Sequence, residues 1–132
     1  MNRNMQVATL LVSLALAGGT LVAQEATLKT LGATDLLGTP GKELSMITVA
    51  YEPGGSSPAH MHRAQAMVYV LEGSIVMQVQ GQPPVTVTAG QTFYEGPDDV
   101  HLVSRNASTT APAKFLVFFV KDKGAPFVLP AK

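Results

Sequence analysis

The sequence has no cysteine among its 132 residues, so disulfide scaffolds, thiolate zinc sites, iron–sulfur clusters and thiol nucleophiles are all excluded. Charged residues are also scarce, at 14% against about 25% in an average chain. Nine basic residues balance nine acidic ones, which leaves no basic surplus for binding nucleic acid. Any chemistry of this chain must therefore come from oxygen and imidazole groups.

Apolar residues, by contrast, make up 46% of the chain, which also has 12 glycines and 9 prolines. The apolar content is enough to offset the entropy of the unfolded chain, and the length fits one domain. The glycines and prolines mark many turns, which favours short strands over long helices. The composition therefore predicts a turn-rich single domain.

Residues 1–23 have the features of a secretory signal peptide. Arg3 gives the segment a basic start, an apolar stretch follows, and Ala23 is a small residue before a polar junction. The apolar stretch is shorter than the ~20 residues that span a bilayer, which favours cleavage after Ala23 over a retained membrane anchor. We therefore expect an exported protein, periplasmic or secreted, whose mature chain begins at Gln24.

The rest of the chain shows a ladder of short β-rich runs. Turn residues separate these runs at roughly 8- to 12-residue spacing, which predicts an all-β sandwich or barrel. The run 67–71 is apolar on both faces, which predicts a strand buried within the sandwich. No stretch has a convincing 3.6-residue period, so little helix is expected. The predicted strands are 44–51, 67–71, 74–80, 85–88, 91–95, 101–104 and 114–120.

These patterns divide the chain into four segments. They are the signal peptide over 1–23, an N-terminal arm over 24–42, a barrel over 43–123 and a C-terminal tail over 124–132. The Gly-Thr-Pro-Gly sequence at 38–41 is typical of a linker, and it would join the arm to the barrel. No second apolar run approaches the ~20 residues of a membrane span, so no stable span is expected after cleavage.

The three histidines are the first candidates for chemistry. His60 and His62 are separated by one residue, so in an extended segment both imidazoles project to the same face. His101 opens a later strand after a Gly-Pro turn, and a meander that set this strand beside the first pair would gather three imidazoles. Imidazole suits zinc, copper, iron and nickel, and manganese is tolerated where carboxylate or water completes the shell. The pattern predicts a site for one divalent metal ion, with zinc, iron, manganese and nickel as candidates.

Two stretches of the sequence resemble a known pair of motifs. Residues 54–73 read Gly-x5-His-x-His-x10-Gly, and residues 90–106 read Gly-Gln-Thr-Phe-Tyr-Glu-Gly-Pro-Asp-Asp-Val-His-Leu-Val-Ser-Arg-Asn. Together they resemble the two motifs of the cupin superfamily, specifically its small single-domain members with a conserved barrel (Cupin_2-like). The resemblance covers residues 43–123 and implies a jelly-roll β-barrel that holds a divalent metal in its mouth. It implies no single reaction, because cupins include dioxygenases, isomerases, lyases, sugar-binding proteins and storage proteins.

The sequence departs from the cupin pattern at a metal ligand. The first motif has a glutamate seven residues before its closing glycine, and here that position is Ala66, whose methyl group cannot bind a cation. The neighbouring Gln65 offers an amide oxygen as a neutral substitute. Strand alternation sets Gln65 and Ala66 on opposite faces, so the other interpretation is that the Gln65 amide bonds the backbone of the preceding loop.

Glu95, Asp98 and Asp99 form an acidic cluster shortly before His101. Glu95 could point into the cavity as a fourth ligand, as a catalytic general base, or as an acceptor that orients an imidazole N–H. It could equally belong to a solvated turn. For the two aspartates we favour the turn, in which one of them accepts from free backbone N–H groups.

Three imidazoles with a weak or neutral fourth ligand leave open positions on a divalent metal, where it can polarise a carbonyl or lower the pKa of bound water. Neutral protein ligands also leave the full double positive charge on the metal, which favours the binding of small molecules with anionic or chelating oxygens. We therefore expect an exported metal-dependent enzyme of dioxygenase, isomerase or lyase type. Its substrate would be a small oxygen-rich molecule such as a diketone, hydroxyacid or phenolic.

Two other functions stay open at this point. One is a non-catalytic module that binds a metal or a small ligand, which the missing motif glutamate supports. The other is a purely structural barrel, against which the retention of all three histidines argues. Small cupins commonly pair, and the apolar run 114–120 fits a homodimer formed through edge strands.

Overall fold

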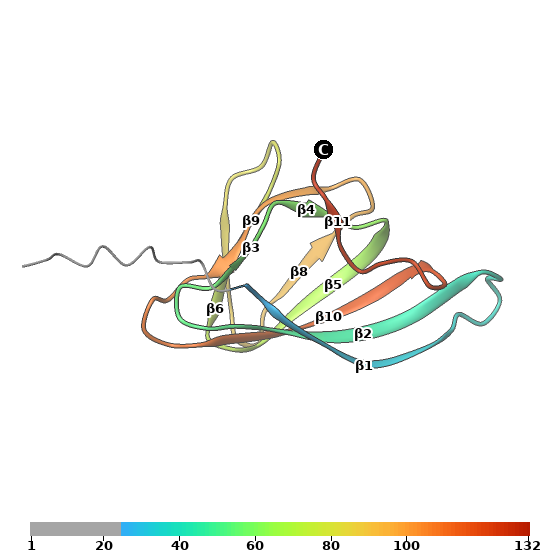
Figure 1. Ribbon diagram of the computed structural model, residues 1–132, viewed down its shortest axis with the longest axis horizontal. Helices are drawn as coiled ribbons and strands as arrows, with labels where there is room; N and C mark the ends of the chain where they lie inside the picture. Colours follow the sequence, from blue (N-terminus) through green and yellow to red (C-terminus); the bar gives the residue numbers. More distant parts are fainter. Residues whose placement is uncertain (1–24) are drawn as a thin grey trace, which may run out of the picture.

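The computed structural model describes residues 25–132, and these residues fold entirely into strands, turns and loops (Figure 1). The signal peptide predicted over 1–23 lies outside the described residues. In the part that is described there is no helix long and apolar enough to cross a membrane. The all-β prediction is confirmed.

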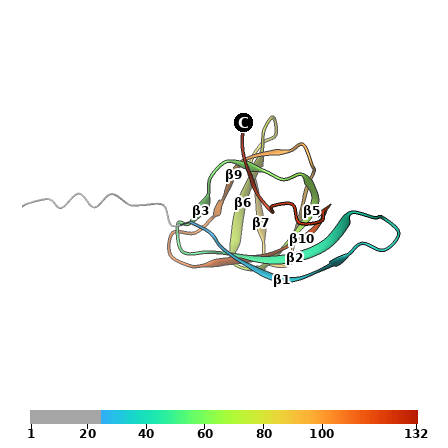
Figure 2. The same cartoon turned by 45° about the vertical axis from the view of Figure 1, so that its right-hand side comes forward.

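Two antiparallel sheets face each other and form a jelly-roll barrel, as the resemblance implied (Figures 1 and 2). One sheet has the strand order β1 (Thr27–Asp35), β2 (Lys42–Tyr51), β10 (Ala113–Asp122), β5 (Ala64–Glu72) and β8 (Thr92–Glu95). The other has the order β11 (Leu129–Pro130), β4 (His60–Met61), β9 (Val100–Asn106), β6 (Ser74–Val79) and β7 (Val85–Thr88), with β3 (Ser56–Ser57) also paired to β9. Strands that are distant in the sequence therefore lie side by side in both sheets.

The core fills the space between the two sheets because each strand turns alternate residues inward. Along β5, Ala64, Ala66, Val68 and Val70 are buried, while the residues between them are exposed. The same alternation holds along β10. The buried apolar residues are Ile47, Val49, Tyr51, Ala64, Ala66, Val68, Val70, Ile75, Met77, Val87, Ala113, Phe115, Val117 and Phe119.

The expectation that the run 67–71 is buried on both faces is wrong. Met67, Tyr69 and Leu71 lie on the outer face of β5, and each is more than two-fifths exposed. Only one face of this strand meets the other sheet, so an apolar run here reflects one buried face and one apolar outer face. The run was misinterpreted because periodicity alone cannot distinguish these two cases.

Both terminal segments contain strands that the sequence did not reveal. The predicted N-terminal arm contains β1, which pairs with β2, and the segment expected as a linker at 38–41 lies in the turn of this hairpin. All nine residues of β1 are exposed, so this strand has no alternation between buried and exposed faces to detect. The predicted C-terminal tail contains β11, which pairs with β4.

Gly73 joins β5 to β6 at a turn that no other residue fits. Its φ is +70°, and a Cβ placed there would lie 2.6 Å from the carbonyl oxygen of Pro112. Gly81 also has a positive φ, of +82°, but a Cβ there would have no heavy atom within 4 Å. The glycine that closes the first motif is therefore required both by its backbone conformation and by the close approach of the neighbouring chain.

We predict that Gly73→Ala destabilises the protein much more than Gly81→Ala. Both substitutions place an alanine at a positive φ, which costs about 1 kcal/mol. Only Gly73→Ala also forces the turn away from Pro112, which raises the expected loss to at least about 2 kcal/mol. Urea unfolding of the two variants measures the difference in unfolding free energy. Equal losses for the two variants would contradict the prediction, because they would show that the turn at Gly73 moves away from Pro112 without cost.

Candidate metal centre

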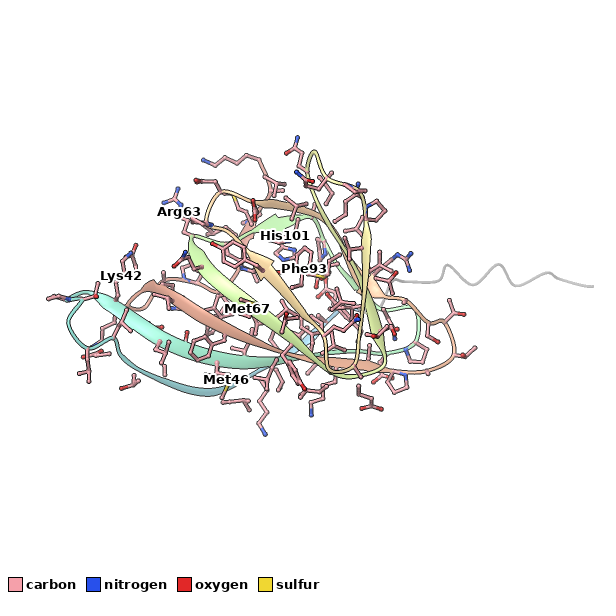
Figure 3. All side chains as sticks on the ribbon, turned by 180° about the vertical axis from the view of Figure 1, so that it is seen from behind. Lys42, Met46, Arg63, Met67, Phe93 and His101 are labelled. Carbon is pink, nitrogen blue, oxygen red and sulfur yellow. The ribbon has the colours of Figure 1, made fainter. Side chains whose placement is uncertain are left out.

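Two strand pairings bring four polar side chains together inside the barrel. β4 pairs with β9 so that His60 lies opposite His101, and His62 follows in the link between β4 and β5. β8 pairs with β5 and ends at Glu95. All four side chains are buried, and His101 (1% exposed) and Glu95 (3% exposed) are the most deeply placed. Figure 3 shows His101 between the two sheets.

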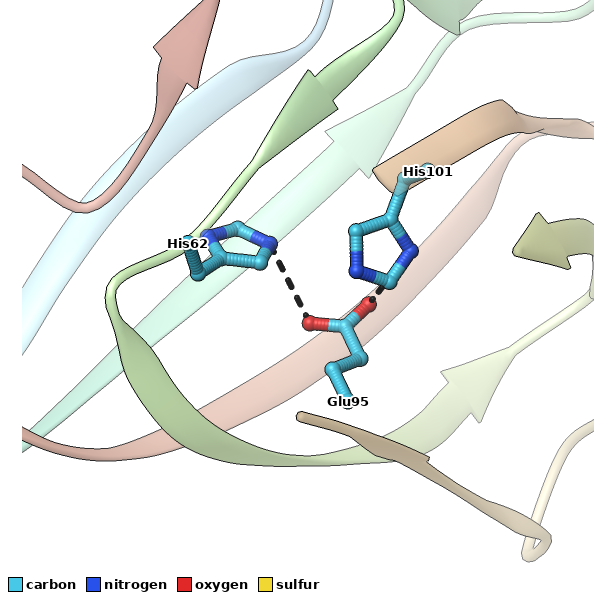
Figure 4. A group of neighbouring side chains, drawn as sticks. All are labelled: His62, Glu95 and His101. Atoms are coloured by element: carbon cyan, nitrogen blue, oxygen red, sulfur yellow. Dashed lines mark ion pairs between the residues drawn. The ribbon is translucent and has the colours of Figure 1, made fainter. Parts of the chain in front are cut away.

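The three imidazoles form a compact triangle. The ring centroids of His60 and His62 are 4.9 Å apart, those of His60 and His101 are 5.1 Å apart, and those of His62 and His101 are 5.2 Å apart. The Glu95 carboxylate lies against two of these rings (Figure 4). Its Oε2 is 3.2 Å from His62 Nε2, and its Oε1 is 3.7 Å from His101 Nδ1. The ligand atoms of His62, Glu95 and His101 lie within 4.8 Å of one another, a spacing that suits a single cation.

Backbone carbonyls fix the orientation of the first two rings. His60 Nδ1 donates to the carbonyl of Pro58 at 2.8 Å, and His62 Nδ1 donates to the carbonyl of Phe127. A carbonyl can only accept, so each ring has a proton on Nδ1, and in the neutral form of each ring the lone pair is on Nε2. This leaves Nε2 as the ligand atom in both, which is the arrangement that metal-binding histidines commonly show.

His101 is the site's unexplained polar group. Both of its ring nitrogens are buried and neither has a hydrogen-bond partner. An unsatisfied buried polar atom costs roughly 1–3 kcal/mol, so such an atom in a folded protein points to a missing water or ion. The buried carboxylate beside it adds the negative charge that a cation requires. The donor set of these residues therefore fits a divalent metal ion.

The pKa values of the three histidines are shifted in different directions. Burial lowers the pKa of His60 and of His101, because charging an imidazole in an apolar interior is unfavourable. Burial also lowers the pKa of His62, but the hydrogen bond and charge of Glu95 and the Phe127 carbonyl outweigh it, so the net shift is upward. His60 and His101 are thus held neutral at pH 7, as metal ligation requires.

The C-terminal segment is part of the site, which the sequence did not reveal. Phe127, whose carbonyl holds His62, packs its ring on Phe119 with centroids 5.3 Å apart. Lys121 Nζ lies 5.0 Å from the Phe127 centroid, donates to the Ala125 carbonyl at 2.6 Å and pairs with Glu43 at 2.5 Å. A backbone carbonyl leaves no signal in residue type, so no sequence pattern could have found this contact.

Gln65, predicted as a substitute ligand, is not brought to the cluster. It lies on the outer face of β5, where it is exposed, and its Nε2 donates to Tyr94 Oη at 3.2 Å. Strand alternation is the reason, because its buried neighbours Ala64 and Ala66 take the inward face. The amide does not bond the preceding loop either.

Glu95 takes the place that the missing motif glutamate would have taken. In the β5–β8 pairing, Glu95 is the direct partner of Ala66. Side chains of directly opposed residues lie on the same face of a sheet with Cβ atoms about 5 Å apart. Both are buried on the inward face of their sheet, so the carboxylate enters the interior beside Ala66 from the neighbouring strand.

The remaining polar residues of the second motif have structural contacts. Asp99 Oδ2 accepts from the backbone N–H of Gly96 at 2.7 Å, which is the turn role expected for this cluster. Asn106 Nδ2 donates to the carbonyls of Glu52 and Ala111. Asp99 thus holds the turn before β9, and Asn106 holds the segments at the far end of β9.

A cavity of about 470 Å³ adjoins the cluster between the sheets. His60, His62 and Glu95 form part of its wall, so groups bound to a metal there would be within reach of a small molecule in the cavity. This volume is typical of small-molecule sites.

Residues 47–119 match the model of the Cupin_2 family, described as a cupin domain. The chain belongs to the cupin family. The matched region of this cupin includes all three histidines and Glu95, so the whole cluster lies within the matched domain. No curated protein sequence matches the chain.

Several solved structures share this fold. A cupin-like protein from Thermotoga maritima is 20% identical, with a TM-score of 0.63 over 80% of this cupin and 75% of that chain. The DMSP lyase DddQ from Ruegeria pomeroyi is 22% identical, with a TM-score of 0.59 over 67% of this cupin and 43% of that chain. An oxalate oxidase in complex with the substrate analogue glycolate is 25% identical, with a TM-score of 0.62 over 91% of this cupin and 62% of that chain. The cupin therefore spans less than half of the lyase and less than two thirds of the oxidase.

We predict that Glu95→Gln destabilises the metal-free protein more at pH 6 than at pH 9. The raised pKa of His62 means that its pairing with Glu95 contributes stability below about pH 6.5, and that this contribution is lost as the pH rises through the folded-state pKa. The expected difference between the two pH values is about 1 kcal/mol, the gap between a charged and a neutral hydrogen bond.

Urea unfolding in the presence of a chelator measures this effect. Asp98→Asn is the matched control, because it removes an acidic group at an exposed position of the same turn. A loss for Glu95→Gln that does not depend on pH would contradict the pairing.

Proposed function

We propose that this cupin binds one divalent metal ion through His60, His62, His101 and Glu95, and that it acts as an enzyme on a small oxygen-containing molecule. The observation that carries the proposal is the buried His101 ring, which has no hydrogen-bond partner on either nitrogen. Zinc, iron, manganese and nickel are the candidate ions, since the donor set joins imidazoles to one carboxylate.

The chain's own residues have distinct tasks at this site. The Pro58 and Phe127 carbonyls keep the Nε2 lone pairs of His60 and His62 aimed inward. The Glu95 carboxylate supplies negative charge and, as a cavity-lining group, is the acceptor for a proton that leaves the substrate. A bound metal would supply Lewis acidity, which polarises a carbonyl or enolate oxygen.

The relatives support an enzymatic function in general terms. Two of the similar structures are a DMSP lyase and an oxalate oxidase, both of which act on small molecules. The dioxygenase, isomerase or lyase type expected from the sequence stays a proposal. The missing motif glutamate no longer favours a non-catalytic module, because Glu95 supplies a carboxylate in the same space.

The structural barrel is the weaker alternative for an energetic reason. A barrel without a ligand would leave the His101 nitrogens buried and unsatisfied, next to a buried carboxylate. Apolar residues would fill that space at lower free energy.

The homodimer expected from the sequence stays a prediction. The outer face of the five-stranded sheet carries exposed Met67, Tyr69 and Phe118, which lie on the paired strands β5 and β10. This face, rather than a strand edge, is where we would look for the contact. The molecular mass in dilute solution, by light scattering, tests it.

We predict that the purified protein binds one divalent ion per chain and that His101→Ala removes it. Removing a residue that only hydrogen-bonds a metal ligand typically weakens metal affinity by roughly 10- to 100-fold. Loss of a direct ligand should weaken the metal affinity by more than this. Glu95→Ala should weaken it as well, because the charge of the cation is then unbalanced. Elemental analysis and calorimetric titration with Zn²⁺ measure both.

Gln65→Ala is the matched control for these variants, because Gln65 lies outside the cluster and is exposed. It should keep the wild-type metal content. A protein without stoichiometric metal, or one whose metal content is unchanged by His101→Ala, would contradict the proposal.

We also propose that the protein is exported and acquires its metal after translocation, on the sequence of residues 1–23 alone. Expression of the full chain in a Gram-negative host should then give a periplasmic protein that begins at Gln24. Intact-mass spectrometry of the recovered protein tests this, and a full-length chain retained in the cytoplasm would contradict it.

A further inference from the structure

The cavity beside the histidines also carries information about the substrate. Its walls are made mostly of apolar side chains from both sheets, with the two ends of the described chain at its margin. The apolar lining residues include Leu28, Ile47, Val49, Met77, Phe115, Val117, Phe119 and Val128. A molecule that fills this space must therefore have a largely apolar body.

No lysine or arginine lines the cavity in the part of the chain that the structure describes. The ionisable lining groups are His60, His62, Glu95, Glu25 and the Tyr51 phenol, of which the two glutamates repel anions. The buried Lys121 is already paired with Glu43. A second anionic group on a ligand, beyond the one bound at the metal, would thus be buried without a counter-charge, which is strongly unfavourable.

One polar group on the wall is set to accept a hydrogen bond. Tyr51 Oη lies 2.7 Å from Ser57 Oγ and 2.8 Å from Ser104 Oγ, and Ser104 donates to Met77 Sδ at 3.3 Å. A thioether has no proton, so the single proton of Ser104 is used there, and Tyr51 must donate to Ser104. The proton of Tyr51 is then also used, so Ser57 donates to Tyr51.

Because the hydroxyl proton of Ser57 is used in the bond to Tyr51, Ser57 Oγ can offer a ligand only its lone pairs. Ser57 is half-buried and lines the cavity, so its Oγ faces a ligand as an acceptor. The matching group on the ligand is a hydroxyl that donates, as in a phenol or an alcohol, and not a carbonyl or an ether.

We propose that the cavity binds a molecule with an apolar body, at most one negative charge carried by its chelating oxygens, and a separate hydroxyl that donates to Ser57. A hydroxylated aromatic or enolic compound meets this description, whereas a dicarboxylate or a hydroxyacid with a second carboxylate does not. The part of the inference that concerns the chelating oxygens rests on the proposed metal site. The apolar body and the hydroxyl rest on the cavity alone.

The first experiment compares two β-diketones that share one chelating head, benzoylacetone and succinylacetone, on the zinc-loaded mature protein. The first has an apolar phenyl group and the second an additional carboxylate. Calorimetry should show benzoylacetone bound at least about tenfold more tightly, because only succinylacetone buries an unpaired charge. Equal or tighter binding of succinylacetone would overturn the proposal.

Two leucines of β1 provide a matched pair of variants for this experiment. Leu28 and Leu31 are both 46% exposed, but only Leu28 lines the cavity. Leu28→Arg should tighten succinylacetone binding about tenfold by supplying the missing cation, and Leu31→Arg should change it less than twofold. An equal effect of both variants would contradict the placement of the charge inside the cavity.

The second experiment needs no metal, so it separates a failure of this inference from a failure of the metal site. On protein stripped with a chelator, 4-ethylphenol should bind about fivefold more tightly than 4-ethylanisole, the ratio that one neutral hydrogen bond gives. Ser57→Ala should abolish this difference, whereas Ser56→Ala, a change to the neighbouring serine that does not line the cavity, should keep it. No preference for the phenol, or a preference that survives Ser57→Ala, would overturn the hydroxyl assignment.

Discussion

The cost of taking ionisable groups out of water governs the centre of this protein. Four such groups, His60, His62, His101 and Glu95, are buried between sheets whose other buried side chains are mostly apolar. Each is tolerated only if a neighbour compensates its lost hydration. Carbonyls of the chain do so for two of the rings, and the carboxylate does so for one of them. His101 is compensated least, because neither of its ring nitrogens has a hydrogen-bond partner and the nearest carboxylate oxygen is 3.7 Å from Nδ1. This is why we propose a cation at the centre of the cluster.

The route by which the carboxylate reaches this centre shows what a motif does and does not specify. The chemistry requires a negative oxygen at one point in space, and the family pattern supplies it from β5. Here β5 has Ala66, and the directly opposed residue of β8, Glu95, supplies the oxygen from the next strand. A small and a large side chain thus face each other across one antiparallel pair, and the larger one supplies the carboxylate.

The barrel strands and the three histidines could be predicted from the sequence, because alternation, turn residues and two spaced motifs all report local constraints. β1 could not be predicted, because both of its faces are exposed and nothing alternates. Gln65 was a candidate ligand on sequence proximity, and the pleat of β5 turned it outward. Glu95 was a candidate from the sequence, but its placement beside Ala66 depended on the register between strands. The contact of Phe127 depended on a backbone carbonyl. Neither register nor carbonyl contacts can be read from residue type.

The contact between Phe127 and His62 also bears on the order in which the protein assembles. β11 and the Phe127 carbonyl come after every other described strand in the sequence, yet they hold the segment that carries the first two histidines. The other barrel strands can therefore pair before the Phe127 carbonyl fixes the ring of His62. On the proposed export route, this last step takes place after translocation, where the ion would be acquired.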